Sequence, residues 1–414
     1  MSWPAAPARD AAALIARPVG PLQADGGPPI KLAVAALSAR LLAEAAEREG
    51  FAVLALDLFG DVDARRASLG WQSIAGARRW HIDEQHLLQG LRQAARLGAQ
   101  GWLAGSGFEA QPALLDAGHR VLPLLGMAGA ALRRLRDPQV FFSFLAAQGL
   151  PHPATQLQPP ASAEGWLIKN SRACGGGHVR PARADEPALP AHHLAQRWSP
   201  GQPMSATFVA DGRSAEVLGF NRLLVSGWGA SPYQFVGATG PLALPPPAEQ
   251  LLRQALQLLV PEFGLVGLGS LDFLLHGAQV QLLEVNARPP ATVALHGVHR
   301  PISAHLAACG GAGLPSARSA GRSGQAAARP GGSAPPVQGF ATVFAERAQQ
   351  VGPALAAALA ALPNHHDLPH TGDLFEPGSP VCSVSAQAAD EPAVQHLLAE
   401  RRARIHQLLE TTAP

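Results

Sequence analysis

The 414-residue sequence has few of the residues that mark several common classes of protein. Its three cysteines, Cys174, Cys309 and Cys382, lie far apart and form no C-x-x-C pair. A zinc ribbon or a disulfide framework is therefore not indicated, and a reducing, cytoplasmic location is expected. Only 15% of residues are charged, and the net charge of +2 is spread without a basic stripe. Nucleic acid is accordingly not expected as a main partner.

Long uninterrupted apolar runs are also missing. The most apolar long stretch, residues 258–275, includes Pro261, Glu262 and Asp272, so neither a membrane span nor a membrane partner is predicted. Residues 1–30 lack the basic region and apolar core of a signal peptide, and we expect a flexible tail there. The 47% hydrophobic content is typical of globular proteins, and the length suits two or three domains.

Lysine is the scarcest charged residue, because only Lys31 and Lys169 are present. Lys169 ends a short apolar strand within GWLIKNSRACGGGHV, residues 165–179, and is followed by Gly175, Gly176 and Gly177. Glycines allow backbone N–H groups to approach a phosphate, and a lysine adds a positive charge. The lysine precedes the glycines, so this is not a Walker A loop. A three-glycine run alone is more often a flexible loop.

A second polar stretch is QLLEVNARPP, residues 281–290, in which Glu284, Asn286 and Arg288 alternate along a predicted strand and share one face. The preceding GSLDFLLHGAQV predicts a partner strand that carries Asp272. Two carboxylates and an amide oxygen on one face suit a hard cation such as Mg²⁺. Chance acids on a solvated edge are the alternative interpretation.

The hydrophobic pattern selects between two pairings of these strands. A two-residue turn at Gly277 and Ala278 sets Asp272 opposite Leu283, which mixes charge with hydrocarbon on both faces. A turn one residue longer sets Asp272 opposite Glu284. The same register sets Phe273 opposite Leu283 and Leu271 opposite Val285. One face is then apolar and the other acidic, so we predict the longer turn.

The chain from Lys31 to Asp57 predicts a strand, a helix and a second strand, as in a parallel α/β sheet. Arg40 follows the first strand, at the edge where such sheets bind ligands. Asp57, Asp61 and Asp63 follow the second strand. They could hold a ribose or could be ordinary turn residues, which is the commoner case.

Gly105, Gly107 and Ala110 imitate the dinucleotide-binding pattern G-x-G-x-x-A. That pattern belongs to the first strand–helix turn of a sheet, and the first turn here has no glycine, so we regard it as a decoy. Ser106 and Glu109 in this turn suit an anion or a polar substrate.

Together, the Lys169 and Glu284 stretches resemble the ATP-grasp superfamily of ATP-dependent ligases. The resemblance implies that Lys169 and the three glycines cover the phosphates of ATP and that Gln196 and Trp198 lie near adenine. It also implies that Asp272, Glu284 and Asn286 bind magnesium and that Arg288 and Lys169 are catalytic. The family often carries a first lysine in the stretch 136–155. Pro138 and Gln139 stand there instead, which leaves open whether Arg134 or Arg136 substitutes.

The stretches SARLLAEAAEREGFAVLALDLFGDVD and GSGFE resemble the predicted carboligase branch of this superfamily, which includes tyramine-glutamate ligase. The fold class implied is α/β and α+β. A Rossmann-like pre-ATP-grasp domain is expected at 31–128 and an ATP-grasp domain at 129–310. A Gly/Ala/Ser/Pro-rich linker is expected at 311–336 and a small α+β domain at 337–414.

The expected function is an ATP- and Mg²⁺-dependent carboxylate–amine ligase that acts through an acyl phosphate. The resemblance implies two magnesium ions, with Mn²⁺ as an alternative, and glutamylation of a tyramine- or tyrosine-type precursor of methylofuran in one-carbon metabolism. Small-molecule carboxylate and amine partners are expected, and a homodimer is left open. The predicted substrate residues are Arg40, Ser106, Glu109 and His296. The alternatives are a nucleotide-binding regulatory or scaffold protein without turnover, which the missing lysine favours, and an NAD-dependent oxidoreductase.

Overall fold

A computed structural model describes residues 29–78, 80–228, 231–310 and 336–411. The predicted N-terminal tail and linker lie almost wholly outside these residues. The chain forms two compact units that divide between Ala130 and Ala131. Each unit is described by itself, and the division into the domains expected from the sequence stays a prediction.

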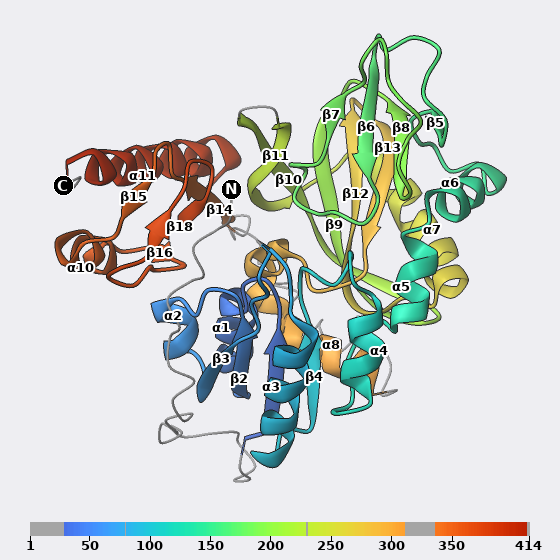
Figure 1. The fold of residues 1–414 in the computed structure, drawn as a ribbon. Helices are drawn as coiled ribbons and strands as arrows, with labels where there is room; N and C mark the ends of the chain where they lie inside the picture. The colour runs from blue at the N-terminus through green and yellow to red at the C-terminus, as the bar shows by residue number, and fades with distance from the viewer. Residues whose placement is uncertain (1–28, 79, 229–230, 311–335, 412–414) are drawn as a thin grey trace, which may run out of the picture. The chain divides into compact units, whose positions relative to one another are not determined.

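The first unit is a parallel sheet with helices (Figure 1). The predicted strand–helix–strand start is confirmed by β1 (Lys31–Ala35), α1 (Arg40–Arg48) and β2 (Ala52–Asp57). The strand order is β3-β2-β1-β4. Helix α1 contacts β2, and α3 contacts β1, β2 and α4. The remaining elements are α2 (Val62–Arg66), β3 (Gly70–Ser73), α3 (Glu84–Arg96), β4 (Gly101–Ala104) and α4 (Ala113–His119).

The side chain of Asp57 stabilises the turn that follows β2. It is fully buried, and its carboxylate accepts hydrogen bonds from Ala39 N (2.8 Å), Gly60 N (2.8 Å), Phe59 N (3.1 Å) and Trp71 Nε1 (2.7 Å). Burial raises the pKa of Asp57, and these donors oppose the rise. Asp57 is therefore a structural turn residue, as the commoner of the two interpretations held.

The second unit contains an eight-stranded sheet with the order β13-β12-β9-β10-β11-β14-β18-β16 (Figure 1). The pairs that link β13 through to β11 are antiparallel. Helix α7 packs against four of these strands and ends at Gly264, which adopts the left-handed conformation. The elements are β9 (Gln202–Asp211), β10 (Ala215–Trp228), β11 (Ser231–Leu242), α7 (Pro246–Phe263), β12 (Val266–His276) and β13 (Gln279–Asn286).

A smaller four-stranded sheet with the order β5-β8-β6-β7 precedes the large sheet in the chain. It consists of β5 (Thr155–Gln156), β6 (Trp166–Asn170), β7 (Arg180–Pro181) and β8 (His193–Arg197). Helices α5 (Gly129–Leu135) and α6 (Pro138–Ala147) lead into it. After β13 come the 3-10 segment η1 (Ala291–His299) and α8 (Pro301–Cys309).

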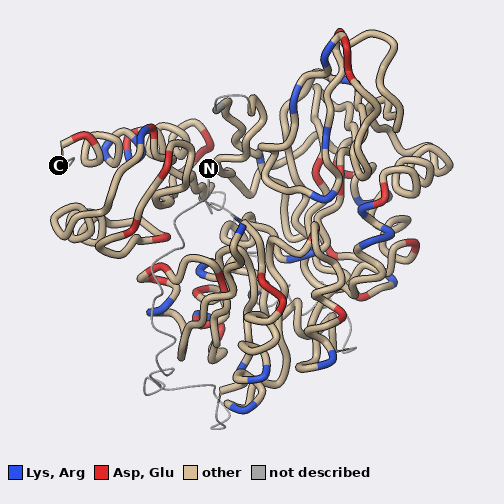
Figure 2. Tube along the Cα trace, viewed as in Figure 1, with Lys and Arg blue, Asp and Glu red and all other residues tan. Residues whose placement is uncertain are grey.

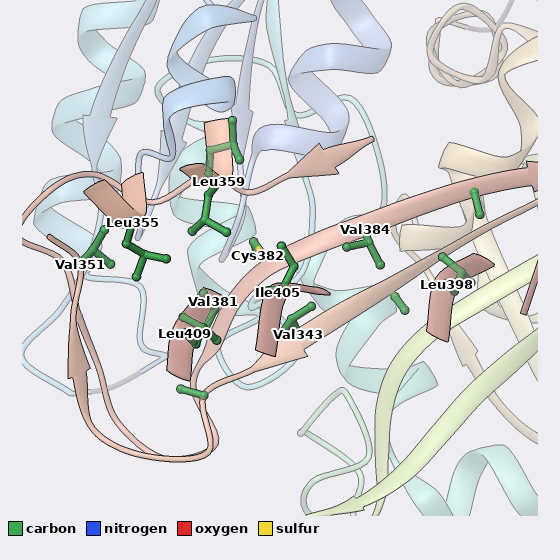
Figure 3. Close-up of a cluster of buried hydrophobic side chains, with 14 of the residues drawn as sticks. Val343, Val351, Leu355, Leu359, Val381, Cys382, Val384, Leu398, Ile405 and Leu409 are labelled. Carbon is green, nitrogen blue, oxygen red and sulfur yellow. The ribbon is translucent and has the colours of Figure 1, made fainter. Parts of the chain in front are cut away.

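The C-terminal strands extend the large sheet, because β14 (Val337–Phe344) pairs with β11. Their own core is shown in Figure 3, where side chains from β14, β18, α10 and α11 pack together. Val394, Leu398, Ile405 and Leu409 recur at helical spacing on α11 and are buried. The elements are β15 (Gln349–Gln350), α10 (Pro353–Ala361), β16 (His365–His366), β17 (Leu374–Phe375), β18 (Pro380–Ala388) and α11 (Glu391–Thr411).

The surface charges follow the balanced composition. Figure 2 shows acidic and basic residues intermixed over the described parts of each unit. No helix in the described residues is both long enough and apolar enough to cross a membrane.

The role of Asp57 generates a first prediction. Asp57→Ala removes the acceptor of four buried or partly buried donors, so we expect the free energy of unfolding to fall by about 3 kcal/mol in a urea titration. Glu47→Ala is the control, because it also removes an acid, from an exposed position of α1, and should change stability by less than about 0.5 kcal/mol. Equal effects of the two substitutions would contradict the structural role of Asp57.

Candidate functional site

A β-bulge in the β12–β13 hairpin brings two carboxylates together. The predicted pairing of Asp272 with Glu284 is confirmed, as is that of Leu271 with Val285. The predicted longer turn is wrong, because His276 pairs with Gln279 across two residues, and Phe273 pairs with Leu282 instead of Leu283. The extra residue is inserted in β13 and not in the turn. The bulge therefore allows a tight turn and still sets the two acids opposite one another.

The two carboxylates are linked through one amide. Asn286 Nδ2 donates to Asp272 Oδ2 (2.9 Å) and to Glu284 Oε1 (3.3 Å). Ser270 Oγ donates to Asp272 Oδ1 (3.0 Å). Burial, and next the charge of Glu284, raise the pKa of Asp272 to about 7. Two acids held this close repel each other, so the site is stabilised by nearby positive charge.

Arg136 and Lys169 supply positive charge from elsewhere in the second unit. Arg136 follows α5, and its Nη1 donates to Glu284 Oε2 (2.9 Å). Burial opposes ionisation of Glu284. The pKa of Glu284 is nevertheless lowered, by the charges of Arg136 and Lys169 and, to a smaller extent, by His178 and the hydrogen bond from Asn286. Burial lowers the pKa of Lys169, while Glu284 and Asp272 oppose this. Lys169, of the small sheet, thus lies close to the acids of the large sheet.

The donor set at Asp272 and Glu284 fits a divalent cation. Carboxylate oxygens are the ligands that Mg²⁺ prefers. An ion between them would offset both the burial and the repulsion from Glu284 that raise the pKa of Asp272. Asn286 fits less directly, because its amide nitrogen faces the carboxylates and its oxygen faces Arg136. Arg288 Nη1 lies 3.4 Å from Pro289 O, and its charge opposes the raised pKa of Asp272.

The glycine loop, which carries Gly175, Gly176 and Gly177, is hydrogen-bonded to β11. Gly175 O accepts from Phe235 N (2.9 Å), and Gly177 O accepts from Ser231 Oγ (2.9 Å). Gly176 has a φ of +75°, and a Cβ there would lie 2.0 Å from Tyr233 O. Only glycine fits at this position, because both the backbone conformation and the close approach exclude a side chain.

The two residues predicted near adenine differ in exposure. Gln196 is buried, and its Oε1 accepts from Lys169 Nζ (2.6 Å) while its Nε2 donates to Thr155 Oγ1 (3.1 Å). Trp198 is 51% exposed, and its backbone N donates to Gly165 O. Gln196 thus positions the lysine, and the placement of both residues near a base stays a prediction.

His178, at the end of the glycine loop, is a site residue that the sequence interpretation did not include. Burial lowers its pKa, and the charge of Glu284 opposes this, which places the ring near Glu284. Its Nδ1 is buried without a hydrogen-bond partner among the described residues. A histidine directly after three glycines was the available signal. Arg136 was considered only as a substitute for an absent lysine.

The predicted substrate residues of the first unit lie at the carboxyl ends of β1 and β4, on the two sides of the point where the strand order changes direction. Arg40 pairs with Glu44 (3.1 Å) and lies 3.8 Å from Asp63. Glu109 is buried and accepts from Gly107 N (2.8 Å), and Ser106 O accepts from Leu37 N. Arg40, Ser106 and Glu109 stay predictions as substrate residues.

His296 is buried in a network of uncharged polar side chains. Asn221 Nδ2 donates to Thr207 Oγ1 (3.0 Å), so its Oδ1 faces His296 Nε2 (3.0 Å), which must carry the proton. Thr207 in turn bonds Thr292 (2.7 Å), which follows the predicted metal strand. Burial lowers the pKa of His296 to about 3. The imidazole is therefore neutral and ties η1 to the sheet.

Comparison with known proteins identifies the domain that carries this geometry. Residues 137–292 match the family model described as the ATP-grasp domain. This part of the chain is similar to the ATP-grasp domain family. The matched range includes Lys169, the glycine loop and both carboxylates, and Arg136 lies one residue before it. No curated protein sequence matches the chain.

Solved structures of biotin carboxylases share the fold of this chain over about nine-tenths of its length. The biotin carboxylase domain of a single-chain bacterial carboxylase is 17% identical with a TM-score of 0.62, over 90% of this chain and 88% of that one. Biotin carboxylase from Campylobacter jejuni is 13% identical with a TM-score of 0.64, over 89% of each chain. The biotin carboxylase domain of 2-oxoglutarate carboxylase from Hydrogenobacter thermophilus is 12% identical with a TM-score of 0.63, over 93% and 90%. The expected α/β and α+β class is confirmed.

The neutral, buried His296 leads to a second prediction. Its folded pKa of about 3 lies below the unfolded value of about 6.5. The contribution of the neutral His296 to the free energy of unfolding is therefore fully present above pH 6.5. It is lost as the pH falls toward 3, at up to about 1.4 kcal/mol per pH unit. We expect the wild type to lose about 2 kcal/mol between pH 7 and pH 5 from this group.

His296→Gln is the matched variant, since its amide nitrogen can donate to Asn221 but does not titrate. We expect the stability advantage of the wild type over His296→Gln to shrink as the pH falls from 7 to 5, and any reversal in favour of the variant comes only from this loss in the wild type. Parallel stability curves for both proteins between pH 7 and pH 5 would show that His296 is not held neutral.

Proposed function

We propose that the protein is an ATP- and magnesium-dependent carboxylate–amine ligase. The observation that carries the proposal is the convergence of Lys169 and the Asp272–Glu284 pair within an ATP-grasp domain. A lysine with a glycine loop suits phosphate oxygens, and the paired carboxylates suit the cation that accompanies them. The positive charges of Arg136, Lys169 and Arg288 lie around the two acids, so the site can neutralise the phosphates of a nucleotide.

Each residue has a distinct part in this proposal. Lys169, which Gln196 holds at 2.6 Å, binds phosphate oxygens together with the backbone N–H groups of the glycine loop. Asp272 and Glu284 would hold Mg²⁺, which supplies positive charge against the phosphates of ATP. Arg288, next to the end of β13, stabilises negative charge on the oxygens of the transferred group.

The reaction proposed has two steps. A carboxylate oxygen of the acid substrate attacks the γ-phosphorus of ATP, the bond to the β-phosphate oxygen breaks, and an acyl phosphate and ADP form. The nitrogen of the amine then attacks the acyl carbon, inorganic phosphate leaves, and the nitrogen loses a proton to give an amide. The acyl phosphate must be kept from water, because water would hydrolyse it before the amine attacks.

The finer substrate proposal depends on the resemblance to the carboligase branch. We propose that the acid is the γ-carboxyl of glutamate and that the amine is a tyramine- or tyrosine-type precursor of methylofuran. The ATP-grasp match supports the use of ATP and does not discriminate among acids and amines. We also propose a cytoplasmic location, from the cysteine usage.

Phosphate release tests the function. With ATP, Mg²⁺ and glutamate, we expect ADP and phosphate to accumulate only when tyramine or tyrosine is added, with the amide detected by mass spectrometry. Release with another acid and amine would retain the ligase and reject these substrates. ATP binding without turnover on a broad panel of acids and amines would favour the regulatory alternative.

Two substitutions connect the activity with the site. Lys169→Met and Asp272→Asn keep side-chain size and remove one charge, and each should lower kcat/KM for ATP by about 100-fold or more. Asp185→Asn, an exposed position in the same unit, is the control and should retain activity. Wild-type rates in Asp272→Asn would reject the assignment of this carboxylate.

A further inference from the structure

The guanidinium of Arg136 occupies one side of the proposed metal site. Arg136 lies between α5 and α6, and its side chain is only 5% exposed. Its Nη1 donates to Glu284 Oε2 (2.9 Å), and its Nη2 donates to Asn286 Oδ1 (2.7 Å). The two acceptors are alternate residues of β13, so one planar group spans both on the face that carries Asp272.

This contact fixes the orientation of the Asn286 amide at both ends. The oxygen accepts from Arg136, and the nitrogen donates to Asp272 (2.9 Å) and Glu284 (3.3 Å). An amide binds a hard cation through its oxygen. With the oxygen turned to a guanidinium and the nitrogen turned to the carboxylates, Asn286 acts as a bridge between them and not as a ligand.

The oxygens that remain suffice for a single ion. Glu284 Oε2 and Asn286 Oδ1 accept from the charged guanidinium. Among the described residues, Glu284 Oε1 and the two oxygens of Asp272 accept only from the uncharged groups of Asn286 and Ser270, so these three oxygens are the ones that a cation can share. A second divalent ion on Glu284 and Asn286 would have to displace a buried, permanently charged arginine. A second divalent ion at this place would also be repelled by the positive charge of the Arg136 guanidinium.

We propose that this site takes one divalent cation, on Asp272 and Glu284, and that the Arg136 guanidinium supplies the positive charge where a second ion was expected from the sequence. This inference rests on the proposed function, since it concerns the cation that accompanies ATP. Arg136 would also substitute for the lysine that the ATP-grasp family often carries in residues 136–155, because it brings a positive charge from that stretch to the site.

Metal stoichiometry tests the proposal without any measurement of turnover. Full-length protein is dialysed to equilibrium against Mn²⁺ and the β,γ-imido analogue of ATP, and bound manganese is counted per bound nucleotide. We expect one ion in the wild type. We expect a second ion in Arg136→Met, because Glu284 Oε2 is released and the Asn286 amide can rotate. Two ions in the wild type, or one ion in both proteins, would overturn the role of Arg136.

Asn286→Ala provides a second readout that does not depend on the folding of the arginine variant. If Asn286 is a bridge, this variant still binds one Mn²⁺ with an affinity within about threefold of the wild type. A loss of tenfold or more, typical for removal of a ligand, would overturn the proposal. Failure of the proposed function has a different signature, because the wild type would then bind neither the nucleotide nor manganese at this site.

Discussion

The site depends on the forced proximity of two carboxylates. Asp272 and Glu284 lie opposite each other because β12 and β13 bury the apolar side chains of their other face, and that face sets the register. Burial, and next the repulsion from Glu284, raise the pKa of Asp272. The groups that gather around them, Arg136, Lys169 and Arg288, come from three separate segments of the chain, and each is attracted by the same pair of charges.

This arrangement explains why the parts of the site best predicted from the sequence were those on adjacent strands. Alternation along a strand placed Glu284 and Asn286 on one face, and the hydrophobic pattern paired Glu284 with Asp272. The same pattern could not locate the extra residue, because a longer turn and a bulge at Leu283 give identical pairing at the acids. The geometry of the Gly277 turn decided between them.

Contacts across long sequence separations were beyond such reasoning. Arg136 reaches Glu284 across 148 residues, and Gln196 reaches Lys169 across 27 residues and from a different strand. Neither contact leaves a periodic signal. His296, which follows the predicted metal strand, was expected near substrate, and that role stays a prediction. The contact of its ring with Asn221 was not anticipated. An apolar neighbourhood around a polar residue does not reveal whether its partner is a ligand or another side chain.

Strand β11 pairs with β10 along one edge and with β14 along the other. Its outer pairing partner is β14, from the C-terminal part of the chain, while Tyr233 and Phe235 at its beginning contact the glycine loop. A strand paired along both edges has little freedom to shift or fray. The C-terminal residues therefore brace β11 from its second edge: they pair with Gly237 to Gly240, just after the residues that contact the glycine loop.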